Sequence, residues 1–123
     1  MAEKQLIVEI GMGADVHGQD VTKAALRAVS DAIRHSSLSV FYTWKRPNKM
    51  RIEVTIASPF PDTLDKRAVA QALPYGTVEV ASVLGGLTDE GMGGSSDTTL
   101  VIAGVRAFLD TADHPFKLVE AET

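Results

Sequence analysis

The segment that most restricts the fold is "LVIAGVRAFL", residues 100–109, because both of its alternating sets of positions are apolar. In a strand, successive side chains point to opposite faces of the sheet. A strand that is apolar on both sides needs cover on both sides. The segment is too short to span a bilayer as a helix, and it carries Arg106. We therefore predict a strand inside a layered assembly.

Periodic patterns divide the rest of the chain into alternating elements. Helical patterns cover residues 21–35 and 63–73, with Asp20 and Asp62 as their N-caps. Strand patterns cover residues 6–10, 39–44, 50–58, 77–84 and 98–110. The order β-α-β-β-α-β-β predicts an α+β two-layer sandwich, with both helices on one face of a mixed or antiparallel sheet. A chain of 123 residues forms one domain, 1–123, and we expect residues 111–123 to be a frayed tail.

Two helices of about fifteen and eleven residues, at 1.5 Å per residue, shield only one face of a four- or five-stranded sheet. The strand at 98–110 nevertheless has apolar side chains on both faces. We therefore expect a homo-oligomer in which sheets of different copies pack against each other. The glycine-rich segment 85–97 is expected to be a mobile loop that closes over a ligand as a lid.

The segment "GMGADVHGQD", residues 11–20, joins the first strand to the first helix and is the candidate site. A nucleotide phosphate fits it poorly. Val16 stands where a dinucleotide fingerprint has its third glycine, and Gln19 and Asp20 replace the lysine and hydroxyl residue of a P-loop. Three other interpretations stay open: a metal site, a proton-transfer site, and a turn that only redirects the chain.

Two side chains in this segment suit metal binding or proton transfer. Asp15 and His17 are two positions apart, so in an extended chain both point the same way and could bind a divalent metal. A histidine also titrates near neutral pH, and a neighbouring carboxylate can orient its ring. Lys23 lies in the first turn of the predicted helix, where the helix dipole disfavours a cation, so we consider it a candidate for holding an anionic substrate.

Composition excludes several classes of function. The net charge of -4 and the pI of about 5.3 argue against nucleic acid and anionic membranes as partners. The basic segment 45–51 is typical of a solvated hairpin tip. The chain has no cysteine, which excludes disulfides and thiolate zinc sites. The first residues lack the layout of a signal peptide, so we expect a cytoplasmic protein.

Gly11, Gly13, Asp15, His17 and Gly18 form the pattern G-x-G-x-D-x-H-G. In this pattern the chain resembles the Lin family of conserved hypothetical proteins from scattered bacteria and plants, which is defined by such a motif near the start of the chain. The likeness continues through the following helix and at "PYGTVEV". The family has no established activity, so the resemblance implies only that the motif does more than turn the chain. The element order is also similar to that of trimeric α+β enzymes such as the chorismate-mutase and ring-opening amidohydrolase groups, a likeness of fold alone.

Three functional hypotheses follow. The first is a small oligomeric enzyme that uses acid–base chemistry on a polar anionic or cyclic-amide metabolite. His17 would be the general acid or base, Asp15 would orient it, and Lys23 or Arg27 would hold the anion. The substrate-binding residues would be Gly11, Gly13, Gly18, Gln19 and Arg27. The second hypothesis is a non-catalytic ligand-binding or assembly module. The third is a metal-dependent hydrolase with Asp15 and His17 as ligands; a divalent metal belongs to this hypothesis only, and otherwise no cofactor is expected.

Overall fold

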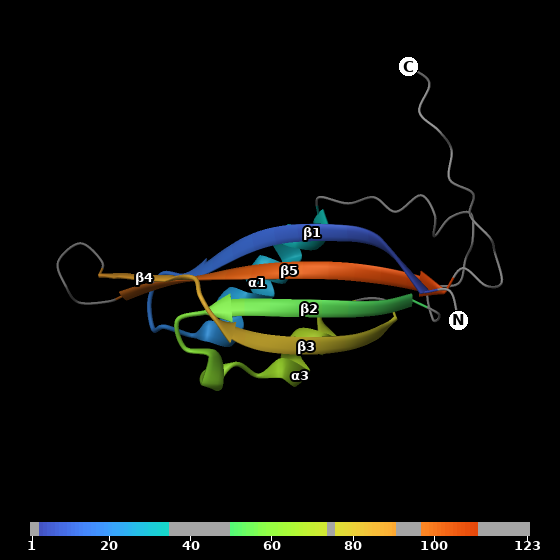
Figure 1. The fold of residues 1–123 in the computed structure, drawn as a ribbon. Helices are drawn as coiled ribbons and strands as arrows, with labels where there is room; N and C mark the ends of the chain where they lie inside the picture. The colour runs from blue at the N-terminus through green and yellow to red at the C-terminus, as the bar shows by residue number, and fades with distance from the viewer. Residues whose placement is uncertain (1–2, 35–49, 74–75, 91–96, 111–123) are drawn as a thin grey trace, which may run out of the picture.

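The computed structural model describes residues 3–34, 50–73, 76–90 and 97–110. These residues form an α+β fold in which two helices pack on one side of a mixed sheet (Figure 1). The predicted strand at 39–44, most of the basic hairpin and the tail 111–123 lie outside the described residues. The predicted fold class is confirmed. Among the described residues, no helix is long and apolar enough to cross a membrane.

The sheet has five strands, and the longest one lies at its centre. The strands are β1 (Glu3–Asp15), β2 (Met50–Ser58), β3 (Thr77–Leu84), β4 (Leu87–Glu90) and β5 (Asp97–Asp110). Their order is β1-β5-β2-β3, and β4 pairs with the start of β5. The β1–β5 and β5–β2 pairs are antiparallel, whereas β2 and β3 are parallel. This arrangement makes β1 and β3 the outer strands.

Helix α1 (Val21–Arg34) forms the second layer because one of its sides is made of small apolar residues. Its buried residues are Val21, Ala24, Ala25, Ala28, Val29 and Ala32. The alanines allow the helix axis to lie close to the sheet. The buried face of the sheet supplies alternate residues of β2 and β5, such as Val54, Ile56 and Val101. This interface is the hydrophobic core of the domain.

Gly11 and Gly13 lie within β1, which corrects the expectation that the strand ends at residue 10. Both are buried under α1. A Cβ atom at Gly11 would collide with the backbone of Ala28 and Ala32, and one at Gly13 would collide with the backbone of Ala24 and Ala28. These glycines therefore allow β1 and α1 to touch backbone to backbone. A sequence pattern of strand, glycines and helix does not distinguish such a contact from a turn.

The second helix is shorter than predicted and begins later. A 3₁₀ turn, η2 (Pro61–Thr63), is followed by an extended Leu64 and then by α3 (Lys66–Gln71). The N-cap of α3 is Asp65, whose side chain accepts a hydrogen bond from the Ala68 backbone N–H at 3.1 Å. The expectation that Asp62 caps the helix was therefore wrong. Pro61 starts the 3₁₀ turn, so Asp62 lies inside that turn.

Residues 87–90 form a strand, which corrects part of the expectation of a loop over 85–97, and residues 91–96 of that predicted lid lie outside the described residues. β5 extends beyond the end of β2, so its backbone groups at Asp97–Leu100 can pair with β4. All four β4 residues are exposed, so the sequence has no alternation of apolar and polar residues from which this strand could be predicted. Gly86 makes the turn into it with a φ of 68°, where a Cβ atom would collide with the Leu100 carbonyl oxygen.

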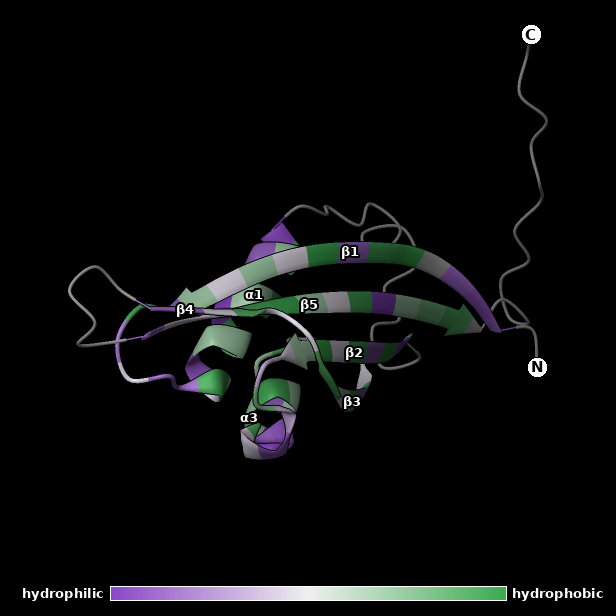
Figure 2. Cartoon of the chain, turned by 60° about the vertical axis from the view of Figure 1, so that its left-hand side comes forward, coloured by the Kyte–Doolittle hydropathy of each residue, from purple (hydrophilic) through white to green (hydrophobic). Residues whose placement is uncertain are grey.

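Neither helix covers the second face of the sheet, which we call the open face (Figure 2). Its residues alternate with the core residues along each strand. Several of them are apolar and exposed, namely Val8, Ile10, Met12, Val83 and Ile102. The prediction that the helices shield one face alone is thus confirmed for the described residues.

Candidate functional site

The joint between β1 and α1, residues 14–20, is organised around the carboxylate of Asp15. This side chain lies at the end of β1 and is only 4% exposed. Its Oδ2 atom accepts a hydrogen bond from the Asp20 backbone N–H at 2.9 Å, across a turn in which Gly18 and Gln19 have positive φ angles of 96° and 53°. Asp15 therefore fixes the path by which the chain leaves the sheet and enters the helix.

Two cations from the first turns of α1 approach the same carboxylate. Lys23 Nζ lies 3.7 Å and Arg27 Nη1 lies 4.0 Å from Asp15 Oδ1. The Asp20 N–H lowers the pKa of Asp15 most strongly, and the charges of Lys23, Arg27 and His17 lower it further, against burial, which raises it. Asp15 is consequently held as an anion, which explains why a lysine is tolerated in the first turn of the helix.

Asp20 is the N-cap of α1, as predicted, because its Oδ1 accepts a hydrogen bond from the Lys23 backbone N–H at 3.0 Å. Gln19 Nε2 donates to Asp97 Oδ2 at 2.7 Å, at the start of β5 and two residues from Thr99, which pairs with Asp15. His17 lies in the bend after β1 and is exposed. The charge of His17 acts on the Asp15 carboxylate, and the action of the two side chains as a pair stays a prediction.

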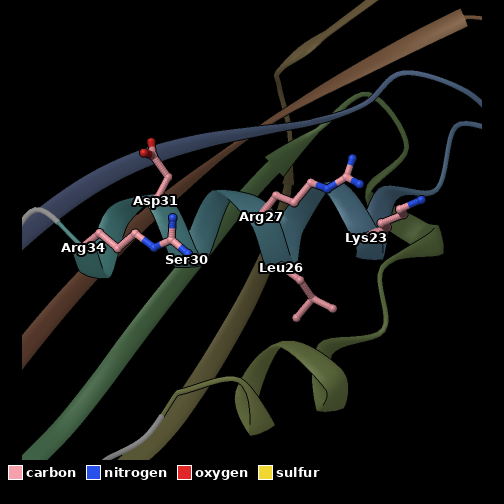
Figure 3. A pocket seen from close by; sticks show the side chains of 6 residues that line it. All are labelled: Lys23, Leu26, Arg27, Ser30, Asp31 and Arg34. Carbon is pink, nitrogen blue, oxygen red and sulfur yellow. The ribbon is translucent and has the colours of Figure 1, made fainter.

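The outer side of α1 carries an open groove of about 440 Å³ beside this joint. Figure 3 shows its lining, which consists of Lys23, Leu26, Arg27, Ser30, Asp31 and Arg34. The three cations outnumber the single carboxylate, so the groove favours an anion. Sequence reasoning assigned most of these residues to a polar helix face, but did not identify the groove, which all six line from α1 alone.

Two groove residues also bind the outer edge of β1. Arg27 Nη1 donates to the Ala14 carbonyl oxygen at 2.6 Å, and Asp31 Oδ2 accepts from the Met12 backbone N–H at 3.0 Å. An outer strand exposes such groups to pairing with another chain. The α1 side chains therefore cover part of the β1 edge, a role that the sequence did not indicate for Asp31.

Buried hydroxyl groups lie in the same layer as Asp15. Thr99 pairs with Asp15 across the β1–β5 ladder, and Ser58 ends the next strand. Both residues are 0% exposed, and neither hydroxyl has a hydrogen-bond partner within the described part of the chain. Sequence reasoning missed both, because a threonine and a serine at strand ends carry no distinctive signal.

The predicted residues thus fall into three groups. Asp15, Lys23 and Arg27 are brought together, His17 and Gln19 lie in the exposed segment between β1 and α1, and Gly11 and Gly13 lie beneath α1. Over the described ranges, no three side chains of His, Asp or Glu form a cluster able to hold a metal ion.

Comparison with known proteins places the chain in a family. Residues 5–107 match the family described as conserved hypothetical protein (Lin0512_fam). A similar solved structure is an FtsZ-like protein of unknown function from Nostoc punctiforme PCC 73102, which is 36% identical, with a TM-score of 0.78 over 89% of this chain and 98% of that chain. A search of curated proteins finds no match. The family match and this structure agree with the sequence resemblance, and the chain belongs to the Lin0512 family of conserved hypothetical proteins.

Proposed function

We propose that this protein is an assembly module that acts as a homo-oligomer, held together through the open face of its sheet. The observation that carries the proposal is the exposure of large apolar side chains on that face. Ile10 is 67% exposed, Met12 61% and Val8 52%, all on β1, and Val83 and Ile102 extend the patch to β3 and β5. Contiguous apolar surface of this kind marks an interaction site.

The size of the open face is suitable for a stable interface. A face four strands wide and nine residues long spans roughly 600 Å² at ordinary strand spacing and rise, before the relief of the side chains is counted. Stable dimers bury about 800 Å² on each partner. Sheets that pack face to face are also a common way to complete a core.

A variant of Ile10 tests this proposal. We expect Ile10→Glu to shift the native oligomer toward the 13.1 kDa chain, because it places a charge in the centre of the apolar patch. The matched control is Leu84→Glu. Leu84 is 78% exposed, but it follows the alternation of the helix-covered face. Light scattering coupled to size exclusion gives both masses. A monomeric native chain, or equal masses for the native chain and Ile10→Glu, would refute the proposal.

The groove on α1 favours a second candidate function, the binding of a small anionic metabolite with acid–base chemistry at the neighbouring joint. Lys23, Arg27 and Arg34 supply positive charge in the groove, and the exposed His17 supplies an imidazole in the joint that leads into α1. The buried Thr99 hydroxyl adds a polar group on the residue that pairs with Asp15. In this proposal the G-x-G-x-D-x-H-G pattern marks the reaction site, and a divalent metal at Asp15 and His17 is its metal-dependent form.

A ligand screen tests the second candidate. Carboxylates, cyclic amides and phosphates would be added to the native chain, and the shift in melting temperature measured. A stabilising anion should lose its effect in Arg34→Ala, because Arg34 lines the groove away from the Asp15 ion pairs. Metal analysis of protein purified without chelator tests the metal-dependent form. The absence of any stabilising compound would leave the assembly module as the better account.

A further inference from the structure

We infer that two copies pack open face to open face about a two-fold axis that runs parallel to the strands, between β5 and β2. This inference rests on the proposed assembly function and specifies its geometry. Such an axis keeps each cross-strand row opposite the same row of the second copy, but reverses its order. β1 then faces β3 of the other copy, and β5 faces β2.

The pairing register fixes which residues meet. Across β1-β5-β2-β3, the open face carries three successive rows: Met12, Ile102, Ala57, Val83; then Ile10, Gly104, Thr55, Ala81; then Val8, Arg106, Glu53, Glu79. Because each row is reversed, its first residue faces the fourth residue of the same row in the second copy, and its second residue faces the third. The surface is therefore required to be complementary to itself, as a two-fold interface demands.

The two apolar rows meet this requirement by size. Ile102 faces Ala57 of the second copy, and Ile10 faces Ala81. Gly104, which has no atom within 4 Å of an added Cβ, faces the Thr55 side chain. Large side chains thus meet small ones, which allows two layers to interlock at close-packed density.

The charged row meets the requirement by sign. Arg106 faces Glu53 of the second copy, and the axis repeats this pair, so the interface gains two opposite-charge contacts and no like-charge contact at its centre. Glu79 lies on the outer strand, and its side chain is 66% exposed, so it can stay in water while Val8 packs beside it.

The next row continues this complementarity. Arg51 already lies over the Phe108 ring of its own chain at 4.3 Å, and the axis places it opposite the second copy's Phe108 as well. An axis across the strands would instead place the charged rows on the apolar rows. Glu53 binds Arg51 of its own chain, but Arg106 would then lose water without gaining a carboxylate of the second copy, which is costly.

A mixing experiment with charge-reversed variants tests this geometry. In a dimer of Arg106→Glu, the new carboxylate of each copy faces the Glu53 carboxylate of the other. In a dimer of Glu53→Arg, the new cation of each copy faces Arg106 of the other. We expect each variant alone to dimerise at least about tenfold more weakly than the native chain. In a one-to-one mixture both contacts become attractive, so the mixed dimer should exceed the half share expected by chance. Native mass spectrometry, with one variant isotopically labelled, measures that share.

The mixing design separates this contact from effects inside one chain. Arg106 and Glu53 are also neighbours within the sheet, and Glu53 binds Arg51 of its own chain. These internal contacts are altered in the variants to the same extent whether the variants are mixed or not. The matched control is a mixture of Arg106→Glu with Glu79→Arg instead of Glu53→Arg. Position 79 lies in the same row but faces Val8 of the second copy, so mixed dimers should make up only the half share expected by chance. A native dimer with a chance share in the first mixture would overturn the axis but leave the assembly proposal standing. A native chain that is monomeric would overturn both.

Discussion

Single residues in this protein determine how closely its two layers approach. Gly13 allows the backbone of β1 to contact the backbone of α1, and Asp15, two residues later, holds the turn into that helix. Both residues belong to the motif that sequence analysis selected. Their observed contacts are structural: a close approach in one case and a buried, ion-paired carboxylate in the other.

We expect Gly13→Ala to lower the free energy of unfolding by about 2 kcal/mol, because the new Cβ collides with helix backbone that cannot move without shifting α1. Gly104→Ala is the matched control. It adds the same methyl group on the open face of the adjoining strand, where nothing of the same chain lies within 4 Å. Both variants are compared after dilution to single chains, because Thr55 of a second copy would face Gly104 in the proposed dimer. Urea denaturation measures both. Equal stabilities for the two variants would show that the layers do not touch at Gly13.

Asp15 should also make folding depend on acid. Its pKa lies below the ordinary 3.8, mainly because of the Asp20 N–H, so the folded state binds the proton less readily than the unfolded state. The resulting stability is present above pH 3.8 and is lost as the pH falls through the lower, folded-state pKa. We expect Asp15→Asn to lack this loss.

Unfolding free energies of the native chain and Asp15→Asn, measured between about pH 6 and pH 2, check this expectation. Their difference should be constant at the upper end and shrink below about pH 4. A difference that stays constant to pH 2 would contradict the assigned role of Asp15.

At the scale of elements, the sequence predicted the existence of most strands and helices better than their ends. The period of α1 and the alternation of β2 are strong signals, because each buries one side against the core. The ends depend on contacts that are distant in sequence. β1 continues through Gly13 because α1 lies over it, and β4 forms because β5 extends past β2.

The start of α3 gives a prediction at this scale. Asp65→Ala should lower the free energy of unfolding by about 1 kcal/mol, since the Ala68 N–H loses its acceptor. Asp62→Ala is the matched control, because Asp62 lies in the preceding 3₁₀ turn and should change stability by less than about 0.5 kcal/mol. Thermal and urea denaturation compare them. A larger loss of unfolding free energy for Asp62→Ala than for Asp65→Ala would contradict Asp65 as the N-cap and favour Asp62, which the sequence indicated.

The outer edge of β1 gives a second prediction at the scale of elements. We expect Asp31→Ala to accelerate hydrogen exchange of the Met12 amide by roughly fivefold to tenfold, as the loss of one hydrogen bond implies. Ser30→Ala, one position earlier on α1, should leave that amide unchanged. An unchanged Met12 rate in Asp31→Ala would mean that the contact does not protect the strand edge.

At the scale of the whole molecule, one sheet carries an apolar surface on each side, but the helices of the described residues lie on only one. The sequence contained this information in residues 100–109, where both alternating sets of positions are apolar. It could not reveal which residues share a row across the sheet, because register depends on long-range pairing. In the proposed dimer, that register makes the open face complementary to itself, and on this basis we propose assembly rather than chemistry at the joint as the main function.

Sedimentation equilibrium of the native chain over a range of concentrations tests this account most directly. We predict a mass of twice the 13.1 kDa chain at tens of micromolar, falling toward the single-chain mass on dilution. A single 13.1 kDa species throughout that range would contradict the account, because the open face would then remain without a second copy.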